Sequence, residues 1–168
     1  EEAIAIKLEG AEKDFFHDFM EKFNYYDLFL IHPKGSVFYT VTHEADYGTN
    51  IINGKYADSG LGEVVRAAIQ NKDFQFADFR PYEPSNGAPA AFIAEPILQH
   101  NTVELIVALQ ISLEEINAVM QERAGMGESG ETYLVGPDNL MRSDSYLDPE
   151  NRSVDASFSN PEKGTVDT

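Results

Sequence analysis

The chain has 168 residues, of which 42% are hydrophobic and 11% aromatic, a composition typical of a globular protein with one core or one core and part of a second. Its net charge of -17, from 29 acidic and 12 basic residues, opposes binding to nucleic acid and to anionic membrane surfaces. The absence of cysteine excludes disulfides, thiolate nucleophiles and cysteine metal sites, and is compatible with either the cytosol or the periplasm.

Apolar residues recur at helical spacing from Glu1 to about Asn24. They occupy every third or fourth position: Ile4, Leu8, Ala11, Phe15, Phe19 and Phe23. This period predicts a long amphipathic helix with a single apolar stripe. Because the pattern is already present at residue 1, we expect the helix to begin further upstream.

The apolar period then changes to two. Residues 27–31 and 36–42 read as two strands joined by the turn His32-Pro-Lys-Gly35, in which Pro33 suits the first central turn position. A long loop rich in Gly, Asn and Asp follows, over residues 43–60. Connections of this length are uncommon and often functional.

A second helix and three more strands follow this loop. Ser59 is suited to cap a helix over residues 60–71. Strands are predicted at 74–82, 89–98 and 103–111, and in the last of them alternate apolar residues indicate a half-buried antiparallel strand. The predicted fold is therefore α+β, with an antiparallel sheet of about five strands packed on a long N-terminal helix.

Three glycines near the C-terminal end have the spacing of a dinucleotide-binding loop. Ser112-Leu-Glu-Glu115 is a capping box that opens a helix continuing to Ala124, and Gly125 then suits a left-handed C-terminal cap. Gly125, Gly127 and Gly130 thus follow a helix and precede a predicted strand at 131–135. Phosphate binding needs the reverse order, so we assign the glycines to a cap and a turn.

The chain after residue 135 carries weaker patterns. "GPDNL" turns it into Met141-Arg-Ser-Asp144, which is consistent with a second hairpin. Residues 146–168 are polar and show no apolar period. They are interpreted either as a tail or as the start of another module.

Three stretches carry a resemblance to a known family. "YYDLFLIHPKGSVFYTVTHEADYGTNIINGKY", "FADFRPYEPSNGAPAAFIAEPI" and "GMGESGETYLVGPDNLMRSDS" resemble the extracytoplasmic sensory regions of bacterial methyl-accepting chemotaxis proteins, which have the PAS-like Cache fold. The order of predicted elements matches that fold as well. The resemblance covers roughly residues 1–145.

The resemblance implies an organisation and a function. Residues 1–130 would form a Cache-like sensor module, and 131–168 a C-terminal hairpin and polar tail or the truncated start of a second module. The domain would lie in the periplasm between transmembrane helices outside this chain, bind a small molecule such as a carboxylate, and form a homodimer in the full receptor. Ligand binding would bias the membrane-connected helix, with no catalysis and no cofactor.

One departure from the family bears on the ligand. Cache domains that bind amino acids resemble one another in an Arg-x-Trp-Tyr cluster, and this chain has no tryptophan. Other small carboxylates therefore remain open as ligands.

The strand at 74–82 offers the first candidate site. Alternation places five of its side chains on one side: Phe74, Phe76, Asp78, Arg80 and Tyr82. Asp78 and Arg80 are either an exposed or rim ion pair, or part of a pocket in which Arg80 binds a carboxylate and Tyr82 supplies a ring and a hydroxyl.

Neighbouring segments complete the candidate site. Phe92 lies between small residues on the next strand, which leaves room for a ligand or for a packed helix. Tyrosines on or near the long loop, with Asp46, either close over a ligand or anchor the loop to the core. The full set of candidate ligand-binding residues is Tyr39, Tyr47, Tyr56, Asp78, Arg80, Tyr82 and Phe92.

No metal or catalytic motif is found. The histidines, at positions 17, 32, 43 and 100, lack metal-ligand spacing, and Glu44, Asp46 and Asp58 lack the spacing of a calcium loop. Neither metal nor cofactor nor catalytic residue is therefore assigned. Three alternatives stay open: the sensor domain of a histidine kinase or nucleotide cyclase, a small periplasmic enzyme using Asp78, Arg80 and a histidine, and a structural dimerisation spacer.

Overall fold

The computed structural model describes residues 11–166. The predicted first turns of the N-terminal helix, with Ile4 and Leu8, lie outside the described residues. Contacts divide the chain into two compact units, Glu1–Ile111 and Ser112–Thr168. Within residues 11–166, no helix has both the length and the hydropathy that crossing a bilayer requires.

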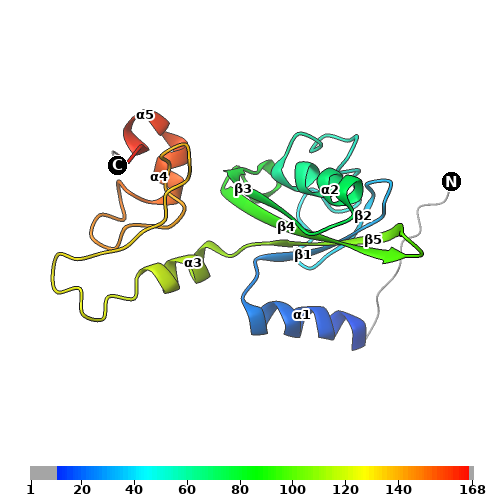
Figure 1. Cartoon of the computed structure of the whole chain (residues 1–168), viewed down its shortest axis with the longest axis horizontal. Helices are drawn as coiled ribbons and strands as arrows, with labels where there is room; N and C mark the ends of the chain where they lie inside the picture. The colour runs from blue at the N-terminus through cyan, green and yellow to red at the C-terminus, as the bar shows by residue number, and fades with distance from the viewer. Residues whose placement is uncertain (1–10, 167–168) are drawn as a thin grey trace. The chain divides into compact units, whose positions relative to one another are not determined.

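The first unit is built on a five-stranded antiparallel sheet (Figure 1). Its strands are β1 (Asp27–Ile31), β2 (Val37–Thr40), β3 (Gln75–Pro81), β4 (Pro89–Gln99) and β5 (Thr102–Gln110). They are arranged in the order β2-β1-β5-β4-β3. The predicted α+β class and antiparallel sheet are confirmed, because hairpins at β1/β2 and β4/β5 keep neighbouring strands antiparallel.

Helix α2 (Gly60–Asn71) covers one face of the sheet (Figure 1). The Ser59 side chain accepts from the Gly62 N–H at 3.1 Å, which confirms the predicted cap. Buried Leu61, Val65 and Ala68 of the helix share one apolar cluster with residues from β1, β2, β3, β4 and β5. This cluster is the main core of the first unit.

Helix α1 (Ala11–Phe23) lies along the opposite face (Figure 1). The predicted stripe is rotated by one position, since Phe16, Phe19 and Met20 pack on the sheet, whereas Phe15 is 62% and Phe23 53% exposed. Two overlapping sets of aromatic residues in this helix both have helical spacing, and only contact with the sheet decides which set is buried.

Two strands present faces other than those predicted. In β3, Ala77 and Phe79 are buried, whereas Phe76 is 57% exposed and Arg80 is also exposed, so the face predicted for the site points outward along the strand. Tyr82, predicted on the same side as Phe76, is buried because it follows Pro81, where β3 and its alternation end. In β5 both faces are covered, and Gln110 is buried rather than exposed.

The long loop between β2 and α2 is anchored to its surroundings. The Asn50 side chain donates to Lys34 O at 2.8 Å and accepts from the Ile52 and Asn53 N–H groups at 2.9 Å. Gly62 of α2 approaches the loop so closely that a Cβ there would collide with Ala57 O. The loop is thus packed against α2 and the β1–β2 turn.

The second unit differs from its predicted form. Helix α3 (Leu113–Met120) is capped by Ser112 as predicted, but its C-cap is Gln121 instead of Gly125. Residues 131–135 form no strand; only an isolated bridge joins Val135 to Met141. Two short helices, α4 (Val154–Ser159) and α5 (Pro161–Gly164), replace the predicted featureless tail.

These helices escaped prediction because their apolar residues are too few to show a period. They are held instead by polar contacts: Asp144 accepts from the Val154 N–H at 2.7 Å, and Ser157 Oγ donates to Gly164 O at 2.8 Å. Such contacts between distant residues leave no periodic signature in a sequence.

Candidate functional site

A group of buried and half-buried polar side chains lies where β5 ends and β1 begins. We name it the acceptor cluster, and it consists of Glu44, Asp46, Tyr82, Ser85 and Gln110. The first two come from the long loop, the next two from the β3–β4 connection, and Gln110 from the end of β5. Buried polar groups require partners, so the hydrogen bonds of this cluster indicate what it can bind.

Asp27 determines where the long loop leaves the sheet. Its buried carboxylate accepts from the backbone N–H groups of Leu28, Val41 and Thr42 at 2.7, 2.9 and 3.1 Å, and from the Thr42 hydroxyl at 2.5 Å. Burial raises the pKa of Asp27, and these hydrogen bonds oppose the rise. The carboxylate thereby joins the start of β1 to the chain that follows β2.

A turn then directs Asp46 inward. The Thr49 N–H and hydroxyl both donate to Asp46 O, at 3.0 and 2.7 Å. The Asp46 residue is 0% exposed. Its Oδ2 atom accepts from the Tyr82 hydroxyl at 2.5 Å.

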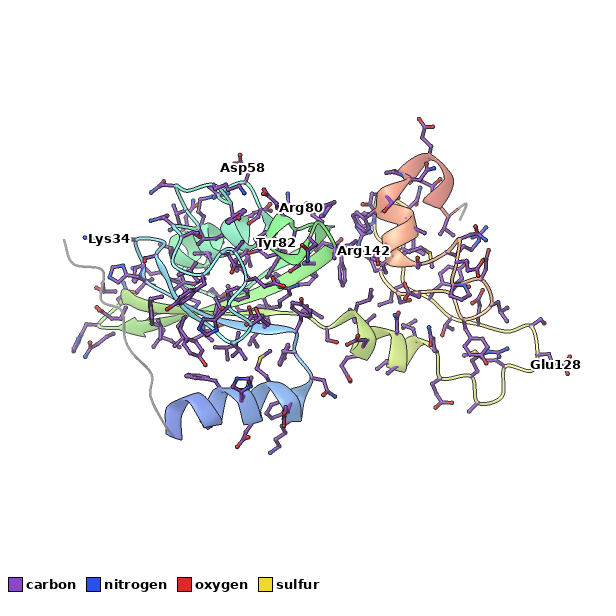
Figure 2. All side chains as sticks on the ribbon, turned by 180° about the vertical axis from the view of Figure 1, so that it is seen from behind. Lys34, Asp58, Arg80, Tyr82, Glu128 and Arg142 are labelled. Atoms are coloured by element: carbon purple, nitrogen blue, oxygen red, sulfur yellow. The ribbon has the colours of Figure 1, made fainter. Side chains whose placement is uncertain are left out.

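Tyr82 is positioned by the short 3-10 helix η1 (Glu83–Ser85) that follows β3. Its N–H donates to Ala88 O at 3.0 Å, and its carbonyl accepts from the Ser85 N–H at 3.1 Å. The ring packs edge-on against Phe92, with centroids 4.9 Å apart. Figure 2 shows Tyr82 within the body of the first unit, whereas Asp58 of the long loop lies at its outer edge.

A second chain of hydrogen bonds runs through Ser85. Gln110 Nε2 donates to Ser85 Oγ at 3.3 Å, and the Ser85 hydroxyl donates to Glu44 Oε2 at 2.7 Å. The other Glu44 oxygen accepts from the Tyr26 hydroxyl at 2.8 Å. Tyr26 lies between α1 and β1, so this chain connects the cluster to the segment that carries α1.

Two buried acceptors of the cluster have no hydrogen-bond partner within residues 11–166. They are Asp46 Oδ1 and Gln110 Oε1. An unsatisfied buried acceptor costs about 1–3 kcal/mol.

The surroundings of the cluster shift the pKa values of Asp46 and Tyr82 upward. Burial raises the pKa of Asp46, Glu44 raises it further, and the Tyr82 hydroxyl opposes the rise. Burial and the nearby carboxylates also raise the pKa of Tyr82 far above its ordinary value, so it stays a hydroxyl donor. The hydrogen bond to Glu44, followed by burial, raises the pKa of Tyr26.

The structure brings together only part of the predicted set. Tyr56, Tyr82 and Phe92 share the core cluster under α2. Tyr39 lies in the separate apolar cluster that faces α1. Tyr47 is exposed, with its ring 4.7 Å from that of His43.

Asp78 and Arg80 lie outside the acceptor cluster. Asp78 is half-buried, and its carboxylate accepts from the Phe79 N–H at 2.8 Å. Arg80 is exposed and forms an ion pair with Glu63 of α2. Arg80 therefore pairs with α2, the helix that covers the sheet, and not with Asp78.

Sequence reasoning missed Tyr26, Ser85 and Gln110 as site residues. Gln110 carried a usable signal, because it shares a strand face with Ile106 and Ala108, and a polar residue at the end of an apolar face needs a partner. Ser85 and Tyr26 carried none, since their roles arise from segments brought together by folding.

Comparison with known proteins identifies the fold. No protein-family model and no curated protein sequence matches the chain. Among solved structures, the ligand-binding domain of Pseudomonas fluorescens chemoreceptor CtaA in complex with L-serine has a TM-score of 0.54 and 14% identity over 97% of this chain. The sensor domain of Vibrio cholerae histidine kinase DctB has a TM-score of 0.52 and 13% identity over 84% of the chain.

The ligand-binding domain of the Pseudomonas aeruginosa amino acid chemoreceptor PctC in complex with GABA has a TM-score of 0.51 and 12% identity over 98% of the chain. The chain has the PAS-like Cache fold. It spans 66% of the CtaA chain, 50% of the DctB chain and 70% of the PctC chain. At these identities the likeness shows the PAS-like Cache fold alone, which the sequence had predicted.

Proposed function

We propose that this chain is a periplasmic small-molecule-sensing domain of a bacterial transmembrane chemoreceptor, with no catalysis of its own. The observation that carries the proposal is the acceptor cluster, in which two buried acceptors stay unpaired within a fold shared with ligand-binding domains. A ligand that donates to these acceptors would remove their energetic cost, which favours the bound form.

The cluster also supports a route for signalling. Glu44 accepts from the Tyr26 hydroxyl, and Tyr26 lies three residues after Phe23, the end of α1. A ligand that moves the long loop would therefore act on the segment between α1 and β1. Under this proposal, ligand binding shifts the population between two positions of α1, the helix that would lead toward the membrane.

A second output remains a candidate. The neighbours include histidine kinase sensor domains as well as chemoreceptors, so the same sensing function would serve a kinase. The two candidates share the ligand-binding step and differ only in the attached output domain.

We also propose that the domain forms a homodimer through α1. Phe15 and Phe23 expose large apolar rings on the side of α1 that does not pack on the sheet, and exposed aromatic residues favour association. Sedimentation equilibrium of the wild type and the Phe15→Ser/Phe23→Ser variant tests this. Dimerisation unchanged by both substitutions would exclude this surface.

Binding is tested on the purified 168-residue chain. Thermal-shift screening against amino acids, amines and small carboxylates, followed by calorimetry on hits, should yield at least one ligand that raises the melting temperature in a saturable manner. Lack of any stabilising compound across such a library would refute direct sensing.

A further inference from the structure

The long loop is joined to the β3–β4 connection by side chains from its beginning and from its second half. Three contacts make this junction, which we call the loop–η1 contact: Asp46 with Tyr82, Glu44 with Ser85, and Lys55 with Glu83. The partners on the connection all lie within positions 82–85, in η1 or directly before it. The loop therefore leaves this end of the first unit only when all three contacts break.

The three contacts differ in how far they are shielded from water. The side chains of Lys55 and Glu83 are 63% and 65% exposed, and exposed ion pairs add little stability. Glu44 is half-buried, whereas Asp46 and Tyr82 are both buried. The hydrogen bond between Asp46 and Tyr82 is therefore the contact on which the attachment of the loop depends most.

Asp46 lies in surroundings that oppose a negative charge. Burial raises its pKa, the nearby Glu44 carboxylate raises it as well, and the Tyr82 hydroxyl opposes the rise. Its Oδ1 atom has no hydrogen-bond partner within residues 11–166. A proton is therefore bound more tightly at Asp46 when the loop is held than when the loop opens to water.

The ionisable groups around Asp46 do not offer the same response. On the β3–β4 connection, burial and the nearby carboxylates raise the pKa of Tyr82 far above its ordinary value, so Tyr82 keeps its proton. On the loop itself, Glu44 accepts from two hydroxyls. At the start of β1, burial raises the pKa of Asp27, but three backbone N–H groups and a hydroxyl donate to its carboxylate and oppose the rise. Asp46 is the acid of this group that is buried with an unpaired oxygen.

We propose that Asp46 makes the loop–η1 contact pH-dependent, so that the long loop is held in acid and is released as the pH rises. A neutral Asp46 carboxyl still accepts from the Tyr82 hydroxyl through one oxygen and no longer repels Glu44. An ionised Asp46 keeps its charge in the core at a cost that an open loop avoids. Since the folded pKa is raised, the stabilisation is present at low pH and is lost as pH rises through that pKa.

The proton would thus be an input that requires no bound molecule, which goes beyond the sensing function proposed above. Release of the loop would also withdraw Glu44 from the Tyr26 hydroxyl, because both belong to the same chain of hydrogen bonds. Tyr26 lies between α1 and β1. The pH would therefore act on the segment that carries α1.

Hydrogen exchange of the ligand-free 168-residue chain tests the proposal. Loop amides report on the contact, since the Thr49 N–H donates to Asp46 O at 3.0 Å and the Gly48 N–H to Val37 O at 2.9 Å. Amides of β5, which lies between β1 and β4 in the sheet, are the internal reference. After correction for the chemical exchange rate at each pH, loop protection relative to β5 should fall by about fivefold or more between about pH 5 and pH 8.

Two substitutions identify the responsible group. Asp46→Asn keeps an acceptor for the Tyr82 hydroxyl but cannot ionise, so the relative protection of the loop should no longer change with pH. Asp58→Asn is the matched control, because Asp58 is an exposed carboxylate on the same loop, and it should retain the wild-type pH dependence. Circular dichroism checks that both variants are folded.

Three results would overturn the proposal. The first is a wild-type loop whose relative protection is constant between about pH 5 and pH 8. The second is an Asp46→Asn protein that keeps the wild-type dependence, since another acid would then be responsible. Should Asp46→Asn fail to fold, Tyr82→Phe decides: it removes the donor that favours the carboxylate, so the fall should extend to higher pH, and an unchanged pH range would be the third.

The same experiment is separable from the test of small-molecule sensing, because no ligand is added. A loop that ignores pH, together with a stabilising compound from the thermal-shift library, would overturn this proposal and leave the sensor domain. A pH-dependent loop without any stabilising compound would refute small-molecule sensing and support the proton as the input.

Discussion

Replacing Tyr82 with Phe tests the central hydrogen bond of the acceptor cluster. The substitution removes the hydroxyl that donates to Asp46 Oδ2 and keeps the ring against Phe92. Asp46 Oδ1 is already unpaired, so the carboxylate would lose its side-chain donor. Since an unsatisfied buried acceptor costs about 1–3 kcal/mol and bonds to charged groups are the stronger ones, we expect the free energy of unfolding to fall by about 2 kcal/mol near neutral pH.

The loss should depend on pH. Burial raises the pKa of Asp46, so above the ordinary Asp value the folded protein retains a proton that the unfolded chain has released. The free energy of unfolding therefore falls as pH rises from the unfolded pKa through the folded one. Removing the Tyr82 hydroxyl, which favours the carboxylate, raises the pKa of Asp46 further. The cost of Tyr82→Phe should thus be larger at about pH 8 than at about pH 4.

Urea unfolding followed by circular dichroism measures this effect, because the chain has no tryptophan for fluorescence. Tyr47→Phe is the control, since Tyr47 is 46% exposed on the same loop, and it should cost less than about 0.5 kcal/mol. In the Asp46→Asn background, the cost of Tyr82→Phe should fall by about 1 kcal/mol or more. Equal costs in both backgrounds, or no change with pH, would refute the reasoning.

Three further substitutions have expected outcomes measurable by the same unfolding assay. Gly62→Ala should destabilise by about 1–3 kcal/mol because its methyl group would collide with Ala57 O; wild-type stability would mean that the loop is not packed as described. Asp27→Ala should cost about 3 kcal/mol or more, since it removes an acceptor shared by three backbone N–H groups, and a smaller cost would argue against the role of Asp27 in joining β1 to the chain after β2. Arg80→Ala removes an exposed ion pair with Glu63 and should cost less than about 1 kcal/mol, so a larger loss would contradict its exposed position.

Local patterns predicted much of the first unit. Residues 60–71 form a helix capped by Ser59 as expected, and residues 27–31 form a strand with the expected bounds. Both depend on interactions within a few residues, namely a side-chain cap on the next turn and an apolar run bounded by turns. The cap of α3 at Ser112 was predicted on the same basis.

Which face of a helix or strand is buried could not be predicted as well as where the element begins and ends. Phe15 and Phe16 are equally apolar, and only packing on the sheet partly buries Phe16 while Phe15 stays exposed. The alternation that placed Tyr82 beside Phe76 ends with β3 at Pro81, and Tyr82 is already the N-cap of η1. An alternation argument holds only within a strand, so it fails once the strand has ended.

The amino-acid sequence by itself determined the element order of the first unit, the N-caps at Ser59 and Ser112, the antiparallel class and the resemblance to Cache sensors, because these depend on residues close together in the chain. The tertiary structure alone decided that Tyr82 bonds to Asp46, that Gln110 bonds to Ser85, and that Arg80 turns to Glu63. Their separations in sequence are large, and the hydrogen bonds that join them form only once the long loop, η1 and the end of β5 are packed together. The arrangement of these polar side chains therefore emerges from folding, and no local pattern in the sequence contains it.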